Sequence, residues 1–277
     1  MKKEVYSMKT EREFTKNDIY FIETVHDKII INDNYQGIII LDEKLNVCAN
    51  IKLFNDIIVD TSYIKGKTIV LYCYENRCFI YFNIETYEYK IIKLNKELYD
   101  ISFLPLYEWK GNELLLLADG GNIIVKLNLS NYEIEKIHKK NYTEYLLRLY
   151  GDWKKISSLT VHKVYSERQI AIVESNNNLQ IINYKSGEIK KLDIKRVDFY
   201  DIETVENCVL QVSEAEVSIS RGDRFVMFYP NDKGYRFLLC KFFDANGVKH
   251  ILVLSSSNAD SSTCKIERYT LDVNLFS

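Results

Sequence analysis

The sequence predicts an all-β fold built from repeated four-stranded units, and three observations support this. Tyr and Phe are abundant, with 21 and 13 copies in 277 residues, whereas Pro occurs twice. Aromatic and β-branched side chains fit the half-buried surface of a pleated sheet. Short apolar runs alternate with polar turns along the whole chain. A hairpin-like pattern also recurs at a nearly regular spacing, and internal repeats of this kind decide the architecture.

The recurring hairpin consists of an apolar strand, a polar turn and an alternating strand. An asparagine stands at the same place in three copies, and an aromatic or apolar residue follows six positions later. These pairs are Asn83 and Tyr89, Asn128 and Ile134, and Asn183 and Ile189. A looser copy begins at Ile39. Because a short polar turn between two β-rich runs predicts a hairpin, each copy should supply two strands of one unit.

A second apolar run precedes each hairpin by roughly ten residues, a separation that leaves room for one more strand. The six runs begin near Lys28, Lys67, Asn112, Arg168, Asn207 and His250. A period of about 40 to 45 residues with several strands per period is typical of the blades of a β-propeller. Four units also carry an acidic residue followed by Ile, at Asp18, Asp56, Asp100 and Asp201. Each of these acids is expected to open the innermost strand of a blade.

The second unit illustrates the expected blade. Its four strands are predicted at Asp56–Ile64, Lys67–Tyr74, Cys78–Asn83 and Tyr89–Leu94, with turns between them. The last unit has three predicted strands, at Arg236–Phe243, Lys249–Ser255 and Thr263–Leu271. The N-terminal segment Lys3–Phe14 is expected to add the fourth strand and close the ring, since closure removes exposed strand edges.

The prediction is therefore an all-β propeller of about six four-stranded blades that forms a single domain over residues 1–277. A two-sheet sandwich also fits many alternating strands, but it explains the period less well. The repeat resembles that of β-propeller proteins at the level of architecture, across nearly the whole chain. It carries no Trp-Asp strand ending, no Gly-Gly of kelch repeats and no Ser-x-Asp-x-Gly box of sialidases. The fold by itself does not fix a function.

An insertion at about residues 139–158 interrupts the repeat in its longest interval. One face of a short helix is predicted there, made of Tyr142, Tyr145, Leu146, Leu149 and Tyr150. Thr143 is expected to cap this helix and Gly151 to end it. Insertions in repeat proteins map to loops, often on the binding face. An inert lid packed on one blade is an equally good interpretation.

Composition excludes several classes of function. The 37 basic and 39 acidic residues give a formal net charge of -2, which does not indicate a nucleic-acid partner. No stretch approaches the roughly 20 apolar residues of a membrane span. The N-terminus is charged and has no apolar core of a secretory signal, so a cytoplasmic location is expected. The six irregularly spaced cysteines are then expected to be thiols on strands.

Motifs for catalysis are nearly absent, and no catalytic, cofactor-binding or metal-binding residue is predicted. Gly66 and Lys67 look like the end of a phosphate-binding loop, but the glycine-rich part is missing. None of the four histidines has metal-ligand spacing to another histidine. Cys73 and Cys78 flank one turn, and two thiols do not complete a tetrahedral zinc site.

The favoured hypothesis is a non-enzymatic protein-binding module. Tyrosine, tryptophan and arginine are enriched in protein interfaces. The insertion supplies all three types, and the residues expected to contact a protein partner are Tyr142, Tyr145, Arg148, Tyr150 and Trp153. The bias toward Ile, Lys, Asn and Tyr resembles proteins of AT-rich bacteria. By analogy, the partner is expected to be a toxin domain that this chain neutralises as an immunity protein.

The alternative hypothesis is a hydrolase or a small-ligand-binding propeller. If Asp18, Asp56, Asp100 and Asp201 open inner strands, their carboxylates can ring the mouth of a central channel. Such carboxylates bind cations or sugars, or act as acid and base. The simpler interpretation is that each aspartate accepts hydrogen bonds from backbone N–H groups at a turn.

Overall fold

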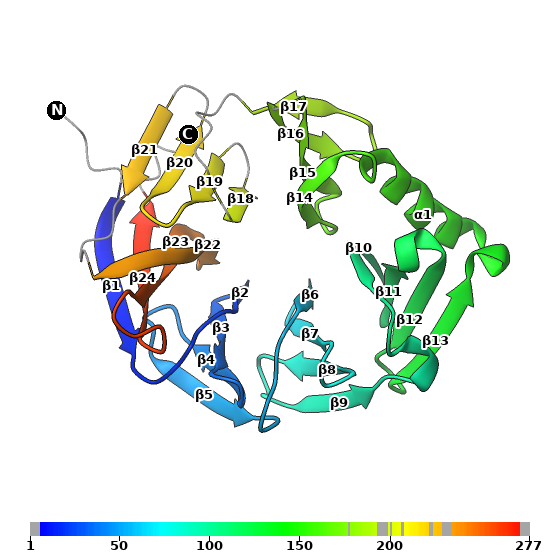
Figure 1. Cartoon of the computed structure of the whole chain (residues 1–277), viewed down its shortest axis with the longest axis horizontal. Coiled ribbons are helices and arrows are strands. Elements are labelled where there is room, and N and C mark those ends of the chain that lie inside the picture. The colour runs from blue at the N-terminus through cyan, green and yellow to red at the C-terminus, as the bar shows by residue number, and fades with distance from the viewer. Residues whose placement is uncertain are drawn as a thin grey trace. The chain divides into compact units, whose positions relative to one another are not determined.

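The computed structural model describes residues 6–176, 178–192, 199, 201–205, 208–221, 224–228 and 234–271. The fold is a six-bladed β-propeller in which each blade is a four-stranded antiparallel sheet (Figure 1). The predicted fold class is therefore confirmed. The chain divides into two compact units. The first contains Met1–Asn76, Phe82–Tyr89 and Ile194–Ser277, and the second contains Arg77–Tyr81 and Lys90–Asp193.

Three blades lie in the first unit. Blade 1 consists of β2 (Ile22–Val25), β3 (Lys28–Asp33), β4 (Gly37–Leu41) and β5 (Val47–Lys52). Blade 5 consists of β18 (Asp201–Val205), β19 (Cys208–Val212), β20 (Val217–Arg221) and β21 (Arg224–Phe228). Blade 6 consists of β22 (Tyr235–Ala245), β23 (Val248–Ser257), β24 (Cys264–Leu271) and β1 (Tyr6–Phe14).

Two blades lie in the second unit. Blade 3 consists of β10 (Phe103–Lys110), β11 (Glu113–Ala118), β12 (Ile123–Asn128) and β13 (Glu133–His138). Blade 4 consists of β14 (Thr160–Tyr165), β15 (Ile170–Ser175), β16 (Asn178–Asn183) and β17 (Ile189–Lys191). Blade 2, made of β6 (Thr61–Lys65), β7 (Thr68–Cys73), β8 (Cys78–Asn83) and β9 (Tyr89–Lys93), contributes residues to both units. The short 3-10 helices are η1 (Lys96–Leu98), η2 (Asp119–Gly121) and η3 (Lys139–Asn141), and the helix α1 spans Glu144–Ile156.

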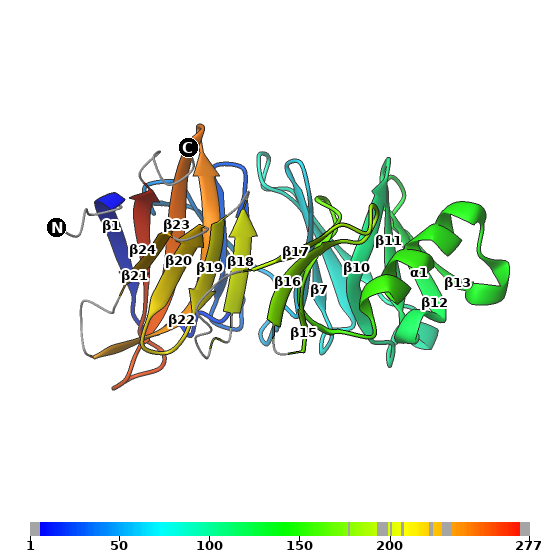
Figure 2. The same ribbon diagram turned by 90° about the horizontal axis from the view of Figure 1, so that it is seen from above.

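The two ends of the chain meet in blade 6, as the sequence predicts. Strand β1 pairs antiparallel with β24, with Glu11 opposite Glu267 and Phe14 opposite Cys264 (Figures 1 and 2). The part of the predicted strand before Tyr6 lies outside the described residues. This pairing gives β24 a hydrogen-bonded neighbour on its outer side, where a three-stranded blade would leave an open edge.

The repeat predicts the second strand of each blade to within two residues. Each of these strands contains a buried apolar run, and Ile29, Val70 and Leu115 in them are fully buried. Sheets covered on both faces require such continuous apolar runs. The predicted start at Asn207 lies outside the described residues, one position before β19.

The prediction that the acidic residue opens each first strand is wrong for three of the four units. Asp18, Asp56 and Asp100 precede β2, β6 and β10 by several residues, and Asp201 alone begins a strand. The segment after Asp56 is hydrogen-bonded to the turn between β3 and β4, where the Ile57 N–H donates to Tyr35 O at 2.7 Å. The following isoleucines, Ile19, Ile57, Ile101 and Ile202, are all buried. The buried isoleucine of the motif therefore fixes the position of the chain where it enters the first strand.

The repeated asparagine has a local role in the turn between the third and fourth strands. Asn83 Oδ1 accepts hydrogen bonds from the N–H groups of Glu85 and Thr86 at 2.9 and 3.2 Å. Asn183 makes the same pair of contacts with Lys185 and Ser186. Side-chain bonds of this kind replace part of the backbone turn, which is why asparagine favours such positions.

Helix α1 lies where the sequence predicts a short helix, but it extends past its predicted end. Thr143 occupies the N-cap position with extended backbone, although its side chain makes no capping hydrogen bond. Gly151 lies inside the helix, which ends at Ile156. A helical glycine costs only about 1 kcal/mol relative to alanine. Continuing the helix buries Ile156 completely, so packing outweighs that cost.

All six cysteines are thiols on strands, as predicted. Within the described part of the chain, no helix combines the length and the apolar character needed to cross a membrane.

Candidate protein-binding surface

Helix α1 is fixed to the second unit by one apolar side. Leu146, Leu149 and Ile156 are buried in a cluster that also contains Leu117 of β11 and Val173 of β15. These residues recur at the spacing of one helical face, so the opposite side of the helix remains available to solvent. The insertion is thus integral to the core of the second unit.

Gly121 allows the aromatic residues of the helix to approach blade 3 closely. A Cβ at Gly121 would lie 2.9 Å from Tyr150 Cε2 and 3.7 Å from Trp153 Cδ1. The φ of this residue is +93°, a value that L side chains rarely adopt. The Tyr142 hydroxyl donates to Gly121 O at 3.1 Å. Glycine is therefore required here both by backbone geometry and by space.

Lysine side chains lie over two half-buried tyrosine rings of the insertion. Lys110 Nζ is 3.8 Å from the centroid of the Tyr145 ring. Lys139 Nζ is 3.9 Å from the centroid of Tyr150 and donates to its hydroxyl at 2.5 Å, and Lys154 Nζ is 5.1 Å from the same ring. The hydrogen bond from Lys139, together with Lys154, lowers the pKa of Tyr150 below its ordinary value. Ring and ammonium groups thus hold each other in place through cation–π attraction.

Two further residues complete a surface that is basic and partly apolar. Leu147 is 50% exposed, and the Arg148 guanidinium donates to Glu108 Oε1 at 2.9 Å. We define the helix surface as Lys110, Lys139, Tyr145, Leu147, Arg148, Tyr150 and Lys154.

Of the five predicted contact residues, Arg148 is exposed and the other four are half-buried. Tyr142, Tyr145 and Trp153 all pack against the apolar cluster, and burial raises the pKa of Tyr142 to about 12. Tyr145, Arg148 and Tyr150 belong to the helix surface. The rings of Tyr142 and Tyr150 meet edge to face, 6.4 Å apart. Tyr142 and Trp153 therefore support the surface from below.

Asp18 and Asp56, two of the four aspartates singled out in the sequence, lie beside Tyr35 in the first unit. The Tyr35 hydroxyl donates to Asp18 Oδ2 at 2.8 Å. This hydrogen bond, with burial and the charges of Asp18 and Asp56, raises the pKa of Tyr35. Tyr35 stacks on Tyr20 with 5.6 Å between ring centroids. Burial raises the pKa of Tyr20 to about 12.

The same region contains an aspartate that sequence reasoning missed. Asp60 Oδ2 accepts a hydrogen bond from the Tyr74 N–H at 2.6 Å, and burial raises its pKa. Ile58 and Tyr74 beside it are 38% and 42% exposed. We define the acidic region as Asp18, Tyr20, Tyr35, Asp56, Ile58, Asp60 and Tyr74.

The other two aspartates do not join this region. Asp201 Oδ1 accepts from the Ile202 N–H at 2.9 Å, and its Oδ2 accepts from the Cys240 N–H at 3.4 Å. This carboxylate therefore satisfies backbone donors, as the simpler interpretation holds. Asp100 lies in the second unit, exposed, between η1 and β10.

Sequence reasoning also missed a buried ion-pair cluster in the first unit. Lys241 forms ion pairs with Glu23 and, at 3.1 Å, with Glu203. All three side chains are less than one-fifth exposed. The signal was present, because Glu23 and Glu203 stand in the same tetrapeptide, Ile-Glu-Thr-Val, in β2 and β18. The cluster ties the first strands of blades 1, 5 and 6 together.

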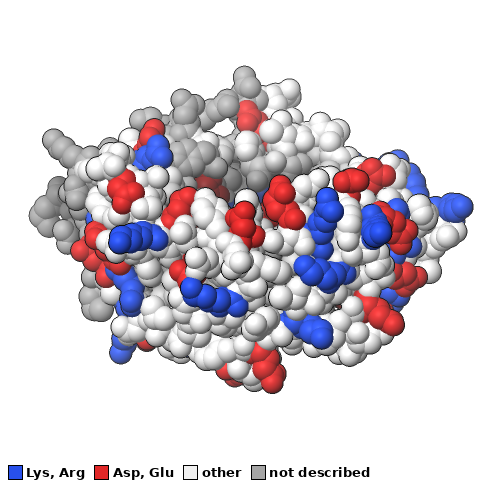
Figure 3. Space-filling view, turned by 60° about the horizontal axis from the view of Figure 1, so that its bottom comes forward, with Lys and Arg blue, Asp and Glu red and all other residues white. Residues whose placement is uncertain are grey.

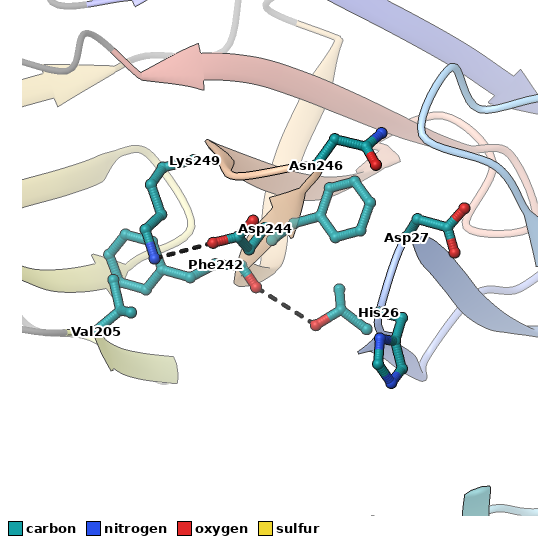
Figure 4. A pocket seen from close by; sticks show the side chains of 9 residues that line it. His26, Asp27, Val205, Phe242, Asp244, Asn246 and Lys249 are labelled. Carbon is teal, nitrogen blue, oxygen red and sulfur yellow. Dashed lines mark hydrogen bonds and ion pairs between the residues drawn. The ribbon is translucent and has the colours of Figure 1, made fainter. Parts of the chain in front are cut away.

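A pocket of about 630 Å³ lies at the turns of the same three blades (Figure 4). Thr24 and Phe242 are among the residues that line it. Its charged groups are paired: Lys249 lies 3.1 Å from Asp244, and the neighbouring Lys28 lies 2.9 Å from Asp27. Among the described residues, no three His, Cys, Asp or Glu side chains are placed to hold a metal ion. The pocket thus presents neutralised charges beside the apolar Phe242 and Val205.

The wider surface carries both signs of charge. Lysine and arginine side chains alternate with aspartate and glutamate side chains over the described residues in Figure 3.

Comparisons of the sequence with models of known protein families and with curated proteins find no significant match. Solved structures do match. The β-propeller domain of Cps50 (Swd1) from Myceliophteria thermophila is 10% identical, with a TM-score of 0.51, covering 92% of this chain and 98% of that one. The WD40 repeats of RRP9 are 7% identical, with a TM-score of 0.47, over 95% of this chain and 98% of that one.

An enzyme is also among the matched structures. A catalytically inactive virginiamycin B lyase from Staphylococcus aureus, with quinupristin, is 14% identical, with a TM-score of 0.43, covering 92% of this chain and 80% of that one. The likeness to the Cps50 domain concerns the fold, at an identity that carries no function across.

Proposed function

We propose that this protein is a non-catalytic propeller that binds another protein through the helix surface. The observation that carries the proposal is the arrangement of Lys110 over Tyr145, and of Lys139 and Lys154 around Tyr150. Tyrosine and arginine dominate the binding energy of many protein interfaces, because they combine apolar area with hydrogen bonding. The surface stands on an insertion, where binding residues of repeat proteins concentrate.

The charge of the surface defines the chemistry of the partner. Lys110, Lys139 and Lys154 have no described carboxylate in ion-pair contact, whereas Arg148 is paired with Glu108. A partner segment with Asp or Glu side chains would meet three ammonium groups, and an apolar side chain would cover Leu147. Complementary charge mainly raises the association rate and sets specificity, while the buried rings slow dissociation.

Charge reversal on the helix tests this proposal. The tagged full chain is used to capture partners from lysate of the cells that produce it, in parallel with the double variant Lys139→Glu and Lys154→Glu. We expect one stoichiometric partner whose capture falls at least about tenfold in the double variant and also falls as ionic strength rises. The matched control is Lys44→Glu with Lys96→Glu, because both lysines are exposed and neither belongs to the helix surface.

The proposal fails if the helix variant and the control variant retain the partner equally. It also fails if no protein partner is captured and a bound small molecule co-purifies with the chain instead. A circular dichroism melt of each variant separates loss of binding from loss of folding.

The finer form of the proposal is that the partner is a cytoplasmic bacterial toxin, which this chain neutralises as an immunity protein. The compositional bias of the sequence and the absence of a catalytic motif support it. Expression of the captured partner alone should then stop growth, and co-expression of this chain should restore it. If the partner is harmless when expressed alone, the immunity hypothesis is wrong, and only the proposal of a protein-binding module remains.

A further inference from the structure

The junction between blades 6 and 1, in the first unit, is apolar along most of its length. Leu252 and Ile266 of blade 6 belong to the same buried cluster as Ile29 of blade 1. His250 and Arg268 continue the same face of blade 6, because alternate residues of a strand point to the same side. Each of these two polar residues is only 6% exposed. The junction therefore encloses an imidazole and a guanidinium group beside its apolar core.

The imidazole of His250 lies among groups that suit its neutral form. Its Nδ1 is 3.1 Å from Thr270 Oγ1, and its ring centroid is 5.8 Å from that of Phe243. Arg268 is the diagonal neighbour of His250 on the adjacent strand β24. Burial, and next the charge of Arg268, lower the pKa of His250 below its ordinary value. A second positive charge at this place is thus unfavourable.

The carboxylates near His250 are engaged elsewhere. Glu43 Oε2 accepts from Asn246 Nδ2 at 3.0 Å, and Asp244 Oδ2 lies 3.1 Å from Lys249 Nζ. Their charges favour protonation of His250, but they do not offset burial and the neighbouring guanidinium group. Within the described part of the chain, the charged groups that act on His250 are Arg268 on β24, Glu43 in the turn between β4 and β5, and Asp244 on β22.

Arg268 fastens the turn between β4 and β5 to blade 6. Its Nη1 donates to Glu43 O in that turn, and its Nη2 donates to Thr10 Oγ1 on β1 at 3.3 Å. Its Nε is buried without an acceptor among the described residues. Arg12 on β1 also donates to Leu45 O in the same turn, at 2.9 Å. One guanidinium group therefore joins the closing strand, β24 and blade 1.

We propose that protonation of His250 opens the junction of blades 6 and 1 in mild acid. The new cation would repel Arg268 inside a poorly solvated junction, where like charges interact strongly. The turn between β4 and β5 would then lose its hydrogen bond from Arg268, and the pairing of β1 with β24 would weaken. Closure of the ring thus depends on the charge of one histidine, as in other pH-sensitive interfaces.

The pH range of the effect follows from the two states of the junction. In the open state His250 is solvated and has its ordinary pKa of about 6.5, whereas in the closed state its pKa is lower. Above pH 6.5 both states are neutral, so the closed junction has its full stability. As the pH falls from 6.5 toward the lower pKa, the open state binds more protons and the closed state loses stability.

Hydrogen–deuterium exchange of the full-length chain at pH 7.5 and 5.0 tests the proposal, with rates corrected for the intrinsic effect of pH on exchange. We expect protection of β1 and of residues 41–47 to fall at least about fivefold at pH 5.0, while protection of β11 is unchanged. His250→Gln removes the titrating group, so this variant should show no fall. The control His138→Gln changes an exposed histidine on β13 and should keep the acid response.

Equal protection at the two pH values overturns the proposal, and so does an unchanged acid response in His250→Gln. An equal loss of protection in β11 also overturns it, because acid would then unfold the whole chain. If His250→Gln does not fold, NMR titration of the His250 ring in the unaltered chain decides. The ring must titrate below its ordinary pKa, over the pH range in which protection is lost.

The junction and the helix surface can be tested separately, because the helix surface belongs to the second unit. Partner capture at pH 7.5 by His250→Gln should equal that of the unaltered chain. Loss of the acid response and loss of the partner are therefore distinguishable results.

Discussion

The helix surface and the acidic region both display tyrosine rings, but the charges around those rings have opposite signs. On the helix, Lys139 and Lys154 lie around Tyr150. In the acidic region, Tyr35 donates to Asp18, and Asp56 lies nearby. No described lysine or arginine forms an ion pair with Asp18, Asp56 or Asp60. The pKa of Tyr150 is lowered and that of Tyr35 is raised, so the same type of side chain lies in opposite electrostatic environments in the two regions.

This difference shows that an abundance of tyrosine does not by itself identify a binding surface or its partner. The side chains that surround each ring determine which partner it suits. The two regions also differ in support. The helix surface stands on a helix packed against an apolar cluster, whereas the acidic region is held by hydrogen bonds, several of which are made by one buried asparagine.

The largest expected effect is the loss of the acidic region on removal of that asparagine. Asn32 is fully buried, and its Oδ1 accepts from the N–H groups of Tyr20 and Phe21 at 3.0 Å. Its Nδ2 donates to Asp18 O and Asn34 O at 2.7 and 2.8 Å. Because several buried groups lose their partners, Asn32→Ala should lower the free energy of unfolding by about 3 kcal/mol or more. Urea denaturation measures this value.

The control for that prediction is Asn50→Ala, on β5, because the exposed Asn50 donates a single hydrogen bond from Nδ2 to Asp33 Oδ2 at 3.0 Å. It should change stability by less than about 0.5 kcal/mol. Similar losses in the two variants would show that Asn32 does not support the acidic region.

A smaller effect is expected when the helix surface is displaced from blade 3. Gly121→Ala combines an unfavourable φ with a contact of 2.9 Å to the Tyr150 ring. We expect a loss of about 2 kcal/mol in the free energy of unfolding, with a changed environment of Tyr150. Gly111→Ala has a φ of +56° and nothing within 4 Å of the added Cβ, so it should lose only about 1 kcal/mol.

Equal losses in the two glycine variants would mean that the Tyr150 ring moves aside without cost. The comparison therefore isolates the contribution of the close approach between helix α1 and blade 3.

The smallest effects concern the titration of the tyrosines themselves. Lys139→Met removes the hydrogen bond that stabilises the phenolate, so the pKa of Tyr150 should rise toward its ordinary value. Asp18→Asn removes a negative charge and the acceptor of the Tyr35 hydroxyl proton, so the pKa of Tyr35 should fall. NMR titration of labelled tyrosine from pH 8 to 12 measures both. If the two variants shifted the tyrosine pKa values in the same direction, the two regions would not have opposite electrostatic environments.

The repeat itself was predictable because its signals are local. Asn83 and Asn183 accept from N–H groups two and three residues ahead, so their turns depend on a few neighbouring residues. The alternation of apolar and polar residues sets the strands in the same way. The closing strand β1 was predictable because the last unit had three strands and one edge to cover.

Sequence by itself thus determined the propeller architecture, the approximate number of blades and the place of the inserted helix. Tertiary structure decided where α1 ends, because burial of Ile156 outweighs the cost of Gly151. It also decided which lysines lie over which rings and that Glu23 and Glu203 share Lys241. The contacts of Lys110 with Tyr145 and of Lys241 with the two glutamates join segments far apart in the chain. Their energies depend on burial and on the sign of nearby charge, which no local pattern of residues encodes.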